Sequence, residues 1–396
     1  MALKKITDAN LKDKKVLARF DFNVPLDKKD RSKITDTSRI DLALPTIKYL
    51  LDQGVSKLVM MSHHGRPDGK VNLDYSLEPV ANYIAEKLSQ EVIFTESAVD
   101  NGVKELLTLK TTKIVLLENL RFHPEEEADG EEFAKKLSEY GDIYVNDAFG
   151  AAHRKHASVH IINKYFHNRA YAGLLMSKEI EALDQILNTP KKPFVAIVGG
   201  AKVSDKIKTI ERLLVSVDSL IIGGAMAYPF LKSKGVAIGN SLCSDEDVQL
   251  AKNILKADRA NKIVLPNDHL VATEFGGQPS PTDTASIKDG YMGLDIGPNT
   301  IVKFSEILKT AKTVLWNGPM GAFENPQYAK GTFALCEIIS SLSHAFTLVG
   351  GGDSVAAVNQ SGYSEKFSHV STGGGASLEY IEKGELPGVK ALKFGV

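Results

Sequence analysis

The stretch Val349-Gly350-Gly351-Gly352-Asp353-Ser354 ends an apolar run, 345–349, and leads into a segment of helical character, 354–358. Glycines let backbone N–H groups approach an oxyanion closely, and the start of a helix presents unpaired N–H donors and the positive end of the helix dipole. Asp353 could hold a divalent cation at the same place. The stretch therefore predicts a binding site for nucleotide phosphates at the end of a β-strand.

A second strand-to-glycine junction has the same form. The apolar run 194–198 leads into Gly199-Gly200-Ala201, which Lys202 and Lys206 follow. If the next helix begins near Lys202, the spacing places both ammonium groups on one face near its first turn. Positive charges at the start of a helix are unfavourable because they lie at the positive end of its dipole, so two lysines there indicate a bound anion. The other interpretation is a glycine-rich turn with solvated lysines.

Further glycine-containing junctions lie in the second half of the chain. Gly223-Gly224 follows 220–222, and Trp316-Asn317-Gly318-Pro319-Met320-Gly321 follows 313–315. Glu324 could accept hydrogen bonds from ribose hydroxyls, although a lone loop glutamate is also commonly just solvated. Ser371-Thr372-Gly373-Gly374-Gly375-Ala376 precedes an expected helix and could direct N–H donors at a transferring group, or could simply reverse the chain. Neither G-x-x-x-x-G-K-[ST] nor G-x-G-x-x-G occurs, which predicts another nucleotide-binding architecture.

In the first half, polar side chains follow four expected strands. Because the carboxyl ends of parallel strands meet at one edge of a sheet, where ligands bind, we expect these groups to converge. They are Asp21 and Asn23 after 16–20, His63 and Arg66 after 58–61, Arg121 after 114–117, and Arg154 after 143–145.

The convergent set, joined by Arg39, suits a small, multiply anionic molecule that carries hydroxyls, such as a phosphorylated hydroxy acid. The other interpretation is that each arginine pairs with a local carboxylate. His153 and His156 could be zinc ligands by residue type, but no third ligand is evident, so a metal there is disfavoured. The acidic patch, residues 125–132, is interpreted as a solvated loop and helix start.

Length and composition limit the number of domains and the classes of partner that the protein could have. The chain has 396 residues, which favours two domains, and 48 basic against 49 acidic residues, which favours neither nucleic acid nor an anionic membrane as a partner. It lacks an apolar run long enough to cross a bilayer, and Cys243 and Cys336 lie far apart without a ligand pattern. We therefore expect a soluble, cytoplasmic protein without disulfides.

Short β-branched runs alternate with helical patterns throughout, which predicts the α/β class. Helical spacing predicts amphipathic helices over 77–88 and 180–187, and the segment 188–193 contains Pro190 and Pro193, which break helix and strand alike. We expect two doubly wound parallel-sheet, Rossmann-like domains with ligands at their carboxyl edges, facing an interdomain cleft. The expected parts are a first domain over 1–175, a connecting helix over 176–188 and a second domain over 189–376.

The motifs together resemble those of the phosphoglycerate kinases from end to end. They match in order and spacing: Asp21-Phe22-Asn23-Val24-Pro25, Ser62-His63-x-Gly65-Arg66-Pro67, Glu118-Asn119-Leu120-Arg121-Phe122, Asn146-Asp147-Ala148-Phe149-Gly150, Gly199 to Lys206, Trp316 to Pro319, and Gly350 to Ser354. The resemblance implies that the first half binds 3-phosphoglycerate or 1,3-bisphosphoglycerate and that the second binds Mg-ADP or Mg-ATP. It also implies a monomer whose C-terminal segment, 377–396, returns to the first domain.

The resemblance further implies a role for individual residues. Those expected to hold the glycerate are Asp21, Asn23, Arg39, His63, Arg66, Arg121 and Arg154. Those expected to hold the nucleotide are Gly200, Ala201, Lys206, Gly223, Gly224, Gly293, Asn317, Pro319, Glu324 and Gly351 to Ser354, with Asp353 on Mg2+. Those expected at the transferred phosphoryl group are Arg39, Lys202, Gly373 and Gly374. His64 and Pro229 depart from the family pattern, and His64 receives no role.

The implied chemistry needs no general base, because a carboxylate nucleophile with a pKa of about 3.5 to 4 is already ionised at neutral pH. The protein then has to align the two substrates and neutralise the charge of the phosphoryl group. The helix before Asn188 is the expected hinge between the two domains. Two alternatives stay open: another ATP-dependent carboxylate kinase or ligase, and a silent nucleotide-binding scaffold.

Overall fold

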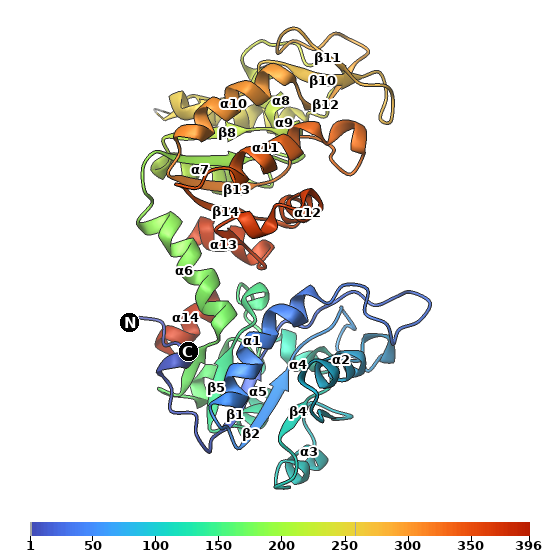
Figure 1. Ribbon diagram of the computed structural model, residues 1–396, viewed down its shortest axis with the longest axis vertical. Helices are drawn as coiled ribbons and strands as arrows, with labels where there is room; N and C mark the ends of the chain where they lie inside the picture. The colour runs from blue at the N-terminus through green and yellow to red at the C-terminus, as the bar shows by residue number, and fades with distance from the viewer. Residues whose placement is uncertain (1, 258) are drawn as a thin grey trace. The chain divides into compact units, whose positions relative to one another are not determined.

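The structure is a computed structural model that describes residues 2–257 and 259–396. The chain divides into two compact units, one formed by the residues up to Glu181 with Glu385–Val396, and the other by Ala182–Gly384. Each unit contains a six-stranded parallel sheet with helices on both of its faces (Figure 1). The predicted α/β class and the two doubly wound parallel sheets are thus confirmed.

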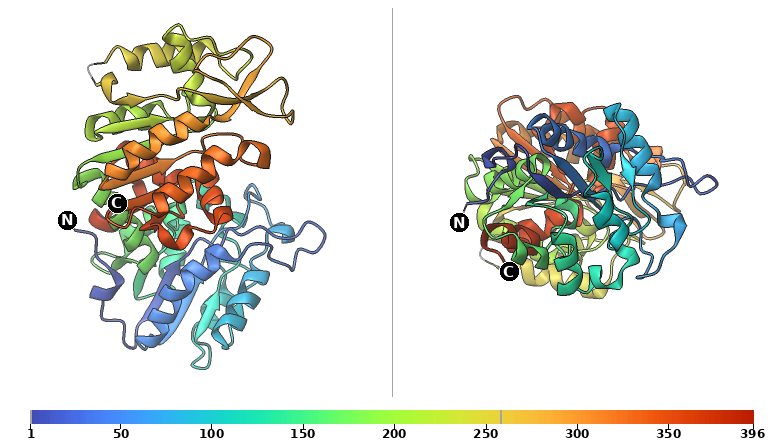
Figure 2. Two further views of the ribbon diagram at one scale, coloured as in Figure 1. Left: turned by 45° about the horizontal axis from the view of Figure 1, so that its top comes forward. Right: turned by 90° about the horizontal axis from the view of Figure 1, so that it is seen from below.

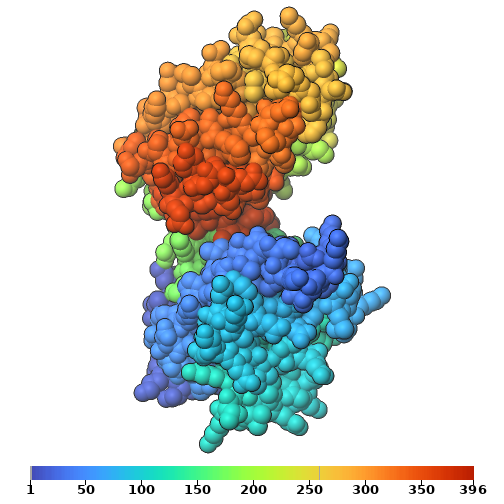
Figure 3. Space-filling view, turned by 45° about the vertical axis from the view of Figure 1, so that its right-hand side comes forward, coloured from blue at the N-terminus to red at the C-terminus, as the bar shows by residue number. Residues whose placement is uncertain are grey.

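The sheet of the first unit has the strand order β3-β4-β2-β1-β5-β6. Its strands are β1 (Lys15–Arg19), β2 (Lys57–Met61), β3 (Ile93–Phe94), β4 (Ile114–Leu116), β5 (Ile143–Asn146) and β6 (Ala170–Ala172). Its helices are α1 (Ser38–Asp52), α2 (Glu78–Leu88), α3 (Asn101–Leu106), α4 (Pro124–Glu127) and α5 (Glu131–Ser138). Helix α2 buries Val80, Ala81 and Ile84, as its apolar spacing predicts. The blue to cyan segments of this unit pack as a continuous surface in the space-filling view (Figure 3).

The sheet of the second unit has the strand order β15-β14-β13-β7-β8-β9. Its strands are β7 (Phe194–Val198), β8 (Ser219–Ile222), β9 (Ile263–Val264), β13 (Thr313–Asn317), β14 (Phe346–Gly350) and β15 (His369–Val370). Its helices are α7 (Ile207–Ser216), α8 (Ala227–Ser233), α9 (Asp245–Leu255), α10 (Pro298–Thr310), α11 (Lys330–Ser340), α12 (Gly352–Ser361) and α13 (Gly375–Lys383). A small antiparallel sheet, which the sequence did not predict, joins β10 (His269–Ala272) to β11 (Ser280–Pro281) and β12 (Met292–Ile296).

The division of the chain differs from the predicted one at the end of the second unit. The boundary between Glu181 and Ala182 lies inside α6 (Leu174–Asn188), which is the helix expected to connect the two domains. Helix α13 belongs to the second unit, where Glu382 accepts a hydrogen bond from Thr209 of α7 at 2.7 Å. The predicted return of the chain at residue 377 is therefore wrong.

The chain returns to the first unit at Glu385. Its last helix, α14 (Pro387–Phe394), packs against β6, and the N–H of Gly388 donates to the carbonyl of Ala152 at 2.9 Å. Both views of Figure 2 show this dark red helix beside the green segment of the first unit. Among the described residues, no helix is long and apolar enough to cross a membrane.

Candidate active site

The carboxyl edge of the first sheet gathers the predicted anion-binding groups. Arg19, the last residue of β1, is in register with Met61 of β2 and Asn146 of β5, so the loops that follow these strands start side by side. Arg39 of α1 donates from Nη1 to Oδ2 of Asp21 at 2.5 Å. A Cβ atom at Gly150 would lie 2.6 Å from the same Asp21 oxygen, so this loop approaches as closely as it does because residue 150 is glycine.

Side chains from neighbouring loops hold the backbone of the loop after β2 against this edge. Asn23 accepts a hydrogen bond at Oδ1 from the N–H of Gly65 at 2.9 Å, and Arg121 donates from Nη1 to the Gly65 carbonyl at 2.7 Å. Gly65 has a φ of +61°, and a Cβ atom there would lie 2.1 Å from the Tyr75 ring. The loop that carries His63 and Arg66 is therefore fixed by its neighbours on both sides.

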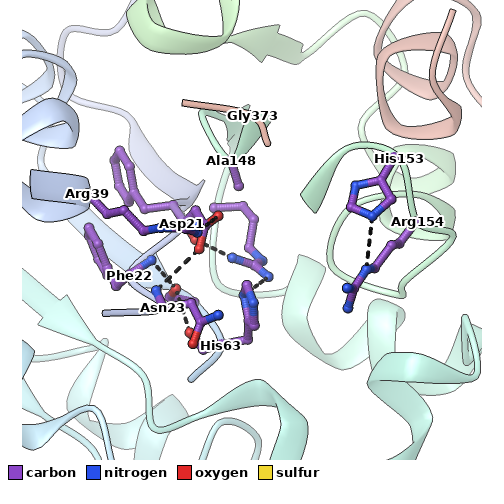
Figure 4. A network of polar contacts seen from close by, with 12 residues as sticks. Asp21, Phe22, Asn23, Arg39, His63, Ala148, His153, Arg154 and Gly373 are labelled. Atoms are coloured by element: carbon purple, nitrogen blue, oxygen red, sulfur yellow. Dashed lines mark hydrogen bonds and ion pairs between the residues drawn. The ribbon is translucent and has the colours of Figure 1, made fainter. Parts of the chain in front are cut away.

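His63 lies among the guanidinium groups of the edge. It is 6 % exposed, and burial, followed by the charges of Arg19, Arg121, Arg39 and Arg154, holds its pKa well below the ordinary value. Three of the predicted arginines therefore act on this imidazole together with Arg19, which the sequence analysis did not single out. Figure 4 shows His63 near Asp21, Asn23 and Arg39. A neutral His63 can donate one hydrogen bond to a ligand without adding charge.

The other two predicted arginines are more open to solvent. Arg154 is partly exposed, and its Nε donates to Nε2 of His153 at 3.2 Å (Figure 4). Arg66 is exposed at the end of the loop that His63 begins. No group of three His, Cys, Asp or Glu side chains that could hold a metal occurs within the residues that the structure describes. Burial, followed by the charge of Arg121, lowers the pKa of His156 to about 3, so this imidazole stays neutral.

Sequence reasoning missed two buried charges beneath this edge. Arg19 and Glu126 are both 0 % exposed, and Glu126 was expected to be solvated as part of the acidic patch. That expectation is wrong because Glu126 turns inward from α4 and accepts two hydrogen bonds from Ser158. A charged residue inside the apolar run 16–20 was the available signal for Arg19, since burying a guanidinium in a central strand requires partners.

The loop after β7 differs from the predicted helix start. Helix α7 begins at Ile207, so Lys202 and Lys206 both precede it, and the expectation that they share a face of its first turn is wrong. The N–H of Ser204 donates to Oδ1 of Asp247 in α9 at 2.9 Å, so this loop is tied to α9 before α7 begins. Lys202 is exposed, whereas Lys206 turns back over the sheet edge.

Lys206 lies on the carbonyl groups at the carboxyl edge of the second sheet. Its Nζ donates to the carbonyls of Gly199 at 2.7 Å and Asn317 at 3.4 Å. Burial lowers its pKa to about 8, against the charges of Asp353 and Asp205. A half-buried ammonium group whose hydrogen-bond partners are neutral carbonyls is suited to a phosphate, which would add a direct negative partner.

The glycines of this edge allow close backbone approach. Gly318 has a φ of +98°, and a Cβ atom there would lie 2.1 Å from the Gly199 carbonyl and 2.6 Å from the Lys206 Nζ. Gly351 has a φ of +90°, and its Cβ atom would lie 2.6 Å from Nδ2 of Asn317. These positions exclude other residues for steric reasons.

Helix α12 covers the segment 354–358 that was predicted to be helical, and it begins two residues earlier, at the last glycine of the stretch. Its first residue is Gly352, and Asp353 lies exposed in its first turn. Ser354 is 0 % exposed, and its Oγ accepts from the N–H of Gly318. Asn317 donates from Nδ2 to the Gly350 carbonyl at 2.8 Å, while its buried Oδ1 has no hydrogen-bond partner within the described residues. That oxygen is free to accept a hydrogen bond from a ligand.

The remaining predicted nucleotide contacts lie on neighbouring segments of the second unit. Gly224 donates from its N–H to the carbonyl of Met320 at 3.1 Å, and Pro319 is buried beside it. Gly293 lies in β12, where the Tyr228 hydroxyl would be 2.0 Å from an added Cβ atom. Ala201 and Glu324 are exposed, and Gly200 and Gly223 both lie at the edge.

The third glycine cluster also precedes a helix. Helix α13 begins at Gly375, and Gly374 before it has a φ of +52°. The N–H of Gly373 donates to Oγ of Ser371 at 3.3 Å.

The two departures from the family pattern have structural roles. His64 is 6 % exposed and contacts the Val24 carbonyl through Nε2 at 3.0 Å. Pro229 is buried in the first turn of α8, where a helix tolerates proline because the N–H there needs no partner within the helix.

Comparisons with known proteins agree along nearly the whole chain. The family model described as "Phosphoglycerate kinase" matches residues 6–384. The phosphoglycerate kinase of Anaeromyxobacter dehalogenans (strain 2CP-C) is 49 % identical, over 99 % of this chain and 100 % of the relative, and that of Borreliella afzelii (strain PKo) is 48 % identical with the same coverage. The solved structure of phosphoglycerate kinase from Coxiella burnetii has a TM-score of 0.89 at 37 % identity and covers 99 % of each chain. The chain therefore belongs to the phosphoglycerate kinase family and is a phosphotransferase.

Proposed function

We propose that this chain catalyses reversible phosphoryl transfer between 1,3-bisphosphoglycerate and ADP, giving 3-phosphoglycerate and ATP, with Mg2+ bound to the nucleotide. The observation that carries the proposal is the contrast between the two sheet edges. One gathers guanidinium groups around a neutral histidine, and the other gathers glycine backbone and a helix start around a half-buried lysine. The first suits a small phosphorylated acid, and the second suits a nucleotide phosphate.

The first unit would bind the glycerate through seven side chains at its sheet edge: Asp21, Asn23, Arg39, His63, Arg66, Arg121 and Arg154. Guanidinium groups pair with carboxylate and phosphate oxygens in two-pronged geometry, which favours Arg121 and Arg154 for the negative ends of the substrate. Asp21 and Asn23 bring acceptors for the hydroxyl group of the glycerate. His63 would add a neutral donor.

The second unit would bind the nucleotide through its glycine edge. The start of α12 offers N–H donors from Gly351 onwards, and Lys206 offers an ammonium group on the same edge. Asp353 is one exposed carboxylate beside those donors, and Mg2+ is commonly held by one or two carboxylates together with substrate phosphates. The residues present therefore fit a magnesium nucleotide, and the ion would neutralise phosphate charge during transfer.

The reaction itself would need alignment more than acid–base chemistry. The attacking carboxylate or phosphate oxygen is already ionised at neutral pH, so no side chain has to remove a proton. Arg39 and Lys202, which are exposed, and the N–H groups near Gly373 and Gly374 would stabilise charge on the equatorial oxygens of the moving phosphoryl group. We further propose that α6 acts as the hinge for a closure that excludes water and protects the acyl phosphate from hydrolysis.

A coupled assay tests the proposal. Purified protein is expected to phosphorylate 3-phosphoglycerate with ATP, and a chelator is expected to abolish the rate until excess Mg2+ restores it. Acetate and unphosphorylated glycerate serve as alternative acceptors. A higher rate with either would favour another carboxylate kinase, and no rate with any acceptor would contradict a kinase function.

We also propose that the protein is a cytoplasmic monomer. The near balance of charges and the absence of a disulfide framework support this. Analytical ultracentrifugation at micromolar concentration is expected to give a single species near 43 kDa, and a species of twice that mass would contradict the monomer.

A further inference from the structure

The buried guanidinium of Arg19 connects the core of the first unit to the candidate active site. It is the last residue of the central strand β1 and is 0 % exposed. Its Nε donates to Oγ of Ser158 at 2.9 Å, and its Nη1 donates to the Phe20 carbonyl. Its Nη2 contacts Nδ1 of His63 at 3.0 Å. Each of its three nitrogens therefore has a partner inside the protein.

A buried carboxylate lies behind Ser158. The hydroxyl of Ser158 donates to Oε1 of Glu126 at 2.6 Å, and its N–H donates to Oε2 at 2.9 Å. Burial raises the pKa of Glu126, and the charge of Arg19 and the bonds from Ser158 oppose that rise. Because both carboxylate oxygens act as acceptors, the contacts fit the ionised form. The Tyr144 hydroxyl donates to the Ser158 carbonyl at 2.7 Å and fixes the serine from its other side.

The direction of every hydrogen bond in this chain of contacts is determined. A guanidinium group only donates, so Nδ1 of His63 must accept from Arg19. Likewise, the Ser158 oxygen must accept from Arg19, which leaves its hydrogen for Glu126. An imidazole whose Nδ1 accepts carries its proton on Nε2 when neutral. The charged groups that act on His63 from the surrounding elements are Arg19, Arg121, Arg39 and Arg154, all of which oppose a second proton on the ring.

We propose that Glu126, Ser158 and Arg19 form a buried positioning relay that holds His63 as a neutral Nε2–H donor toward the glycerate site. The inference rests on the proposed function, because it assigns His63 a substrate contact. It adds that His63 acts as a fixed donor and not as a proton shuttle, and that residues remote from the ligand control its tautomer. Arg19 is a positioning residue, since its donors are taken up by Ser158, Phe20 and His63.

The relay makes the tautomer of His63 directly measurable. Protein labelled with ¹⁵N-histidine is examined by long-range ¹H–¹⁵N NMR between about pH 6 and 8, and the His63 signals are assigned by their loss in His63→Gln. We expect Nε2 to be protonated, Nδ1 to be unprotonated, and neither shift to titrate in this range. An Nδ1–H tautomer or an imidazolium at pH 7 would overturn the proposal. This readout does not depend on catalytic activity, so it can fail or succeed independently of the proposed function.

Ser158→Ala removes the hydroxyl that connects Arg19 to Glu126 while leaving both charges in place. We expect mixed tautomers at His63 and a KM for 3-phosphoglycerate raised roughly tenfold, as loss of one charge-assisted hydrogen bond would give. The KM for ATP should stay unchanged, which a general loss of folding would not produce. Ser138→Ala is the matched control, because Ser138 is half-buried at the end of α5, away from the relay, and its hydroxyl donates to the carbonyl of Lys135 at 2.7 Å. Wild-type tautomer and KM in Ser158→Ala would contradict the relay.

A double variant covers the case in which a single change unfolds the protein. Arg19→Met with Glu126→Gln removes both buried charges together, so that neither is left unpaired. Because the Arg19 charge lowers the pKa of His63, its removal should raise that pKa toward the ordinary value of a histidine. The KM for 3-phosphoglycerate should then acquire a pH dependence that the wild type lacks. A pH profile identical to the wild type would show that Arg19 does not control His63.

Discussion

The two sheet edges share one architecture but use different chemical groups. The edge of the first unit consists of charged and polar side chains on buried supports, such as the neutral His63 on the charged Arg19. The edge of the second unit consists mainly of backbone groups, with Gly318 and Gly351 in left-handed conformations that bring peptide groups together. A side-chain site depends on charge and tautomer, whereas a backbone site depends on the absence of Cβ atoms. Substitutions should therefore damage the two edges in different ways.

Arg39→Ala should give the largest effect and tests the side-chain edge. Arg39 is 44 % exposed at its side chain and reaches Asp21 at 2.5 Å. We expect kcat to fall roughly 100-fold or more with little change in KM, because the guanidinium would act mainly on the transition state. Steady-state kinetics measure this, and Arg31→Ala, at an exposed arginine in the preceding loop, is the control. A near-normal kcat would remove Arg39 from phosphoryl transfer.

Gly318→Ala tests the backbone edge. The new Cβ atom would meet the Gly199 carbonyl at 2.1 Å at a φ of +98°, so the backbone must shift and Lys206 must move with it. We expect nucleotide affinity to fall roughly tenfold to 100-fold and the Tm to fall by several degrees, while 3-phosphoglycerate affinity is retained. Calorimetric titration and thermal unfolding measure both.

Gly235→Ala separates crowding from backbone strain in this experiment. Gly235 also has a positive φ, +80°, but an added Cβ atom would meet nothing within 4 Å. It should therefore lose about 1 kcal/mol of stability and no nucleotide affinity. Equal losses of affinity in the two variants would show that close approach at Gly318 is unimportant.

The comparison also shows what sequence can predict. Strands and their glycine or polar ends are local signals, so the two sheets and the gathering of His63 with Arg39 and Arg121 were predictable. The start of α7 was not, because a distant contact between Ser204 and Asp247 holds the preceding loop. Glu126 was misjudged because its neighbours in sequence are charged, while its burial depends on Ser158. Local pattern predicts elements, but the pairing of buried charges requires the tertiary structure.

Lys206→Ala tests the half-buried cation of the backbone edge that we assign to the nucleotide. Loss of a charge-assisted hydrogen bond to phosphate should weaken Mg-ADP binding roughly tenfold. In the free protein, burial lowers the Lys206 pKa to about 8, and a bound phosphate should raise it. Binding above about pH 8 should therefore take up a proton in the wild type and not in the variant.

Calorimetry in buffers of different ionisation enthalpy measures that proton. Lys208→Ala is the control, because Lys208 is exposed on α7 two positions further on. Unchanged Mg-ADP affinity in Lys206→Ala, or equal proton uptake in both proteins, would contradict a phosphate contact at Lys206.

Asp295→Asn should give the smallest effect, and it contrasts a buried acid of the second unit with Glu126 of the first. Asp295 accepts hydrogen bonds from the N–H groups of Ile296 at 2.9 Å and Gly331 at 2.6 Å, and burial raises its pKa to about 7. Burial also raises the pKa of Glu126, but there the nearby charge of Arg19 acts against the rise. A carboxyl group with a raised folded pKa binds more protons folded than unfolded, so its contribution to stability falls as pH rises from about 4 to 7. Asp295→Asn should remove this part of the pH dependence, which Tm measurements across that range detect as a flatter profile, and an unchanged slope would mean that Asp295 ionises normally.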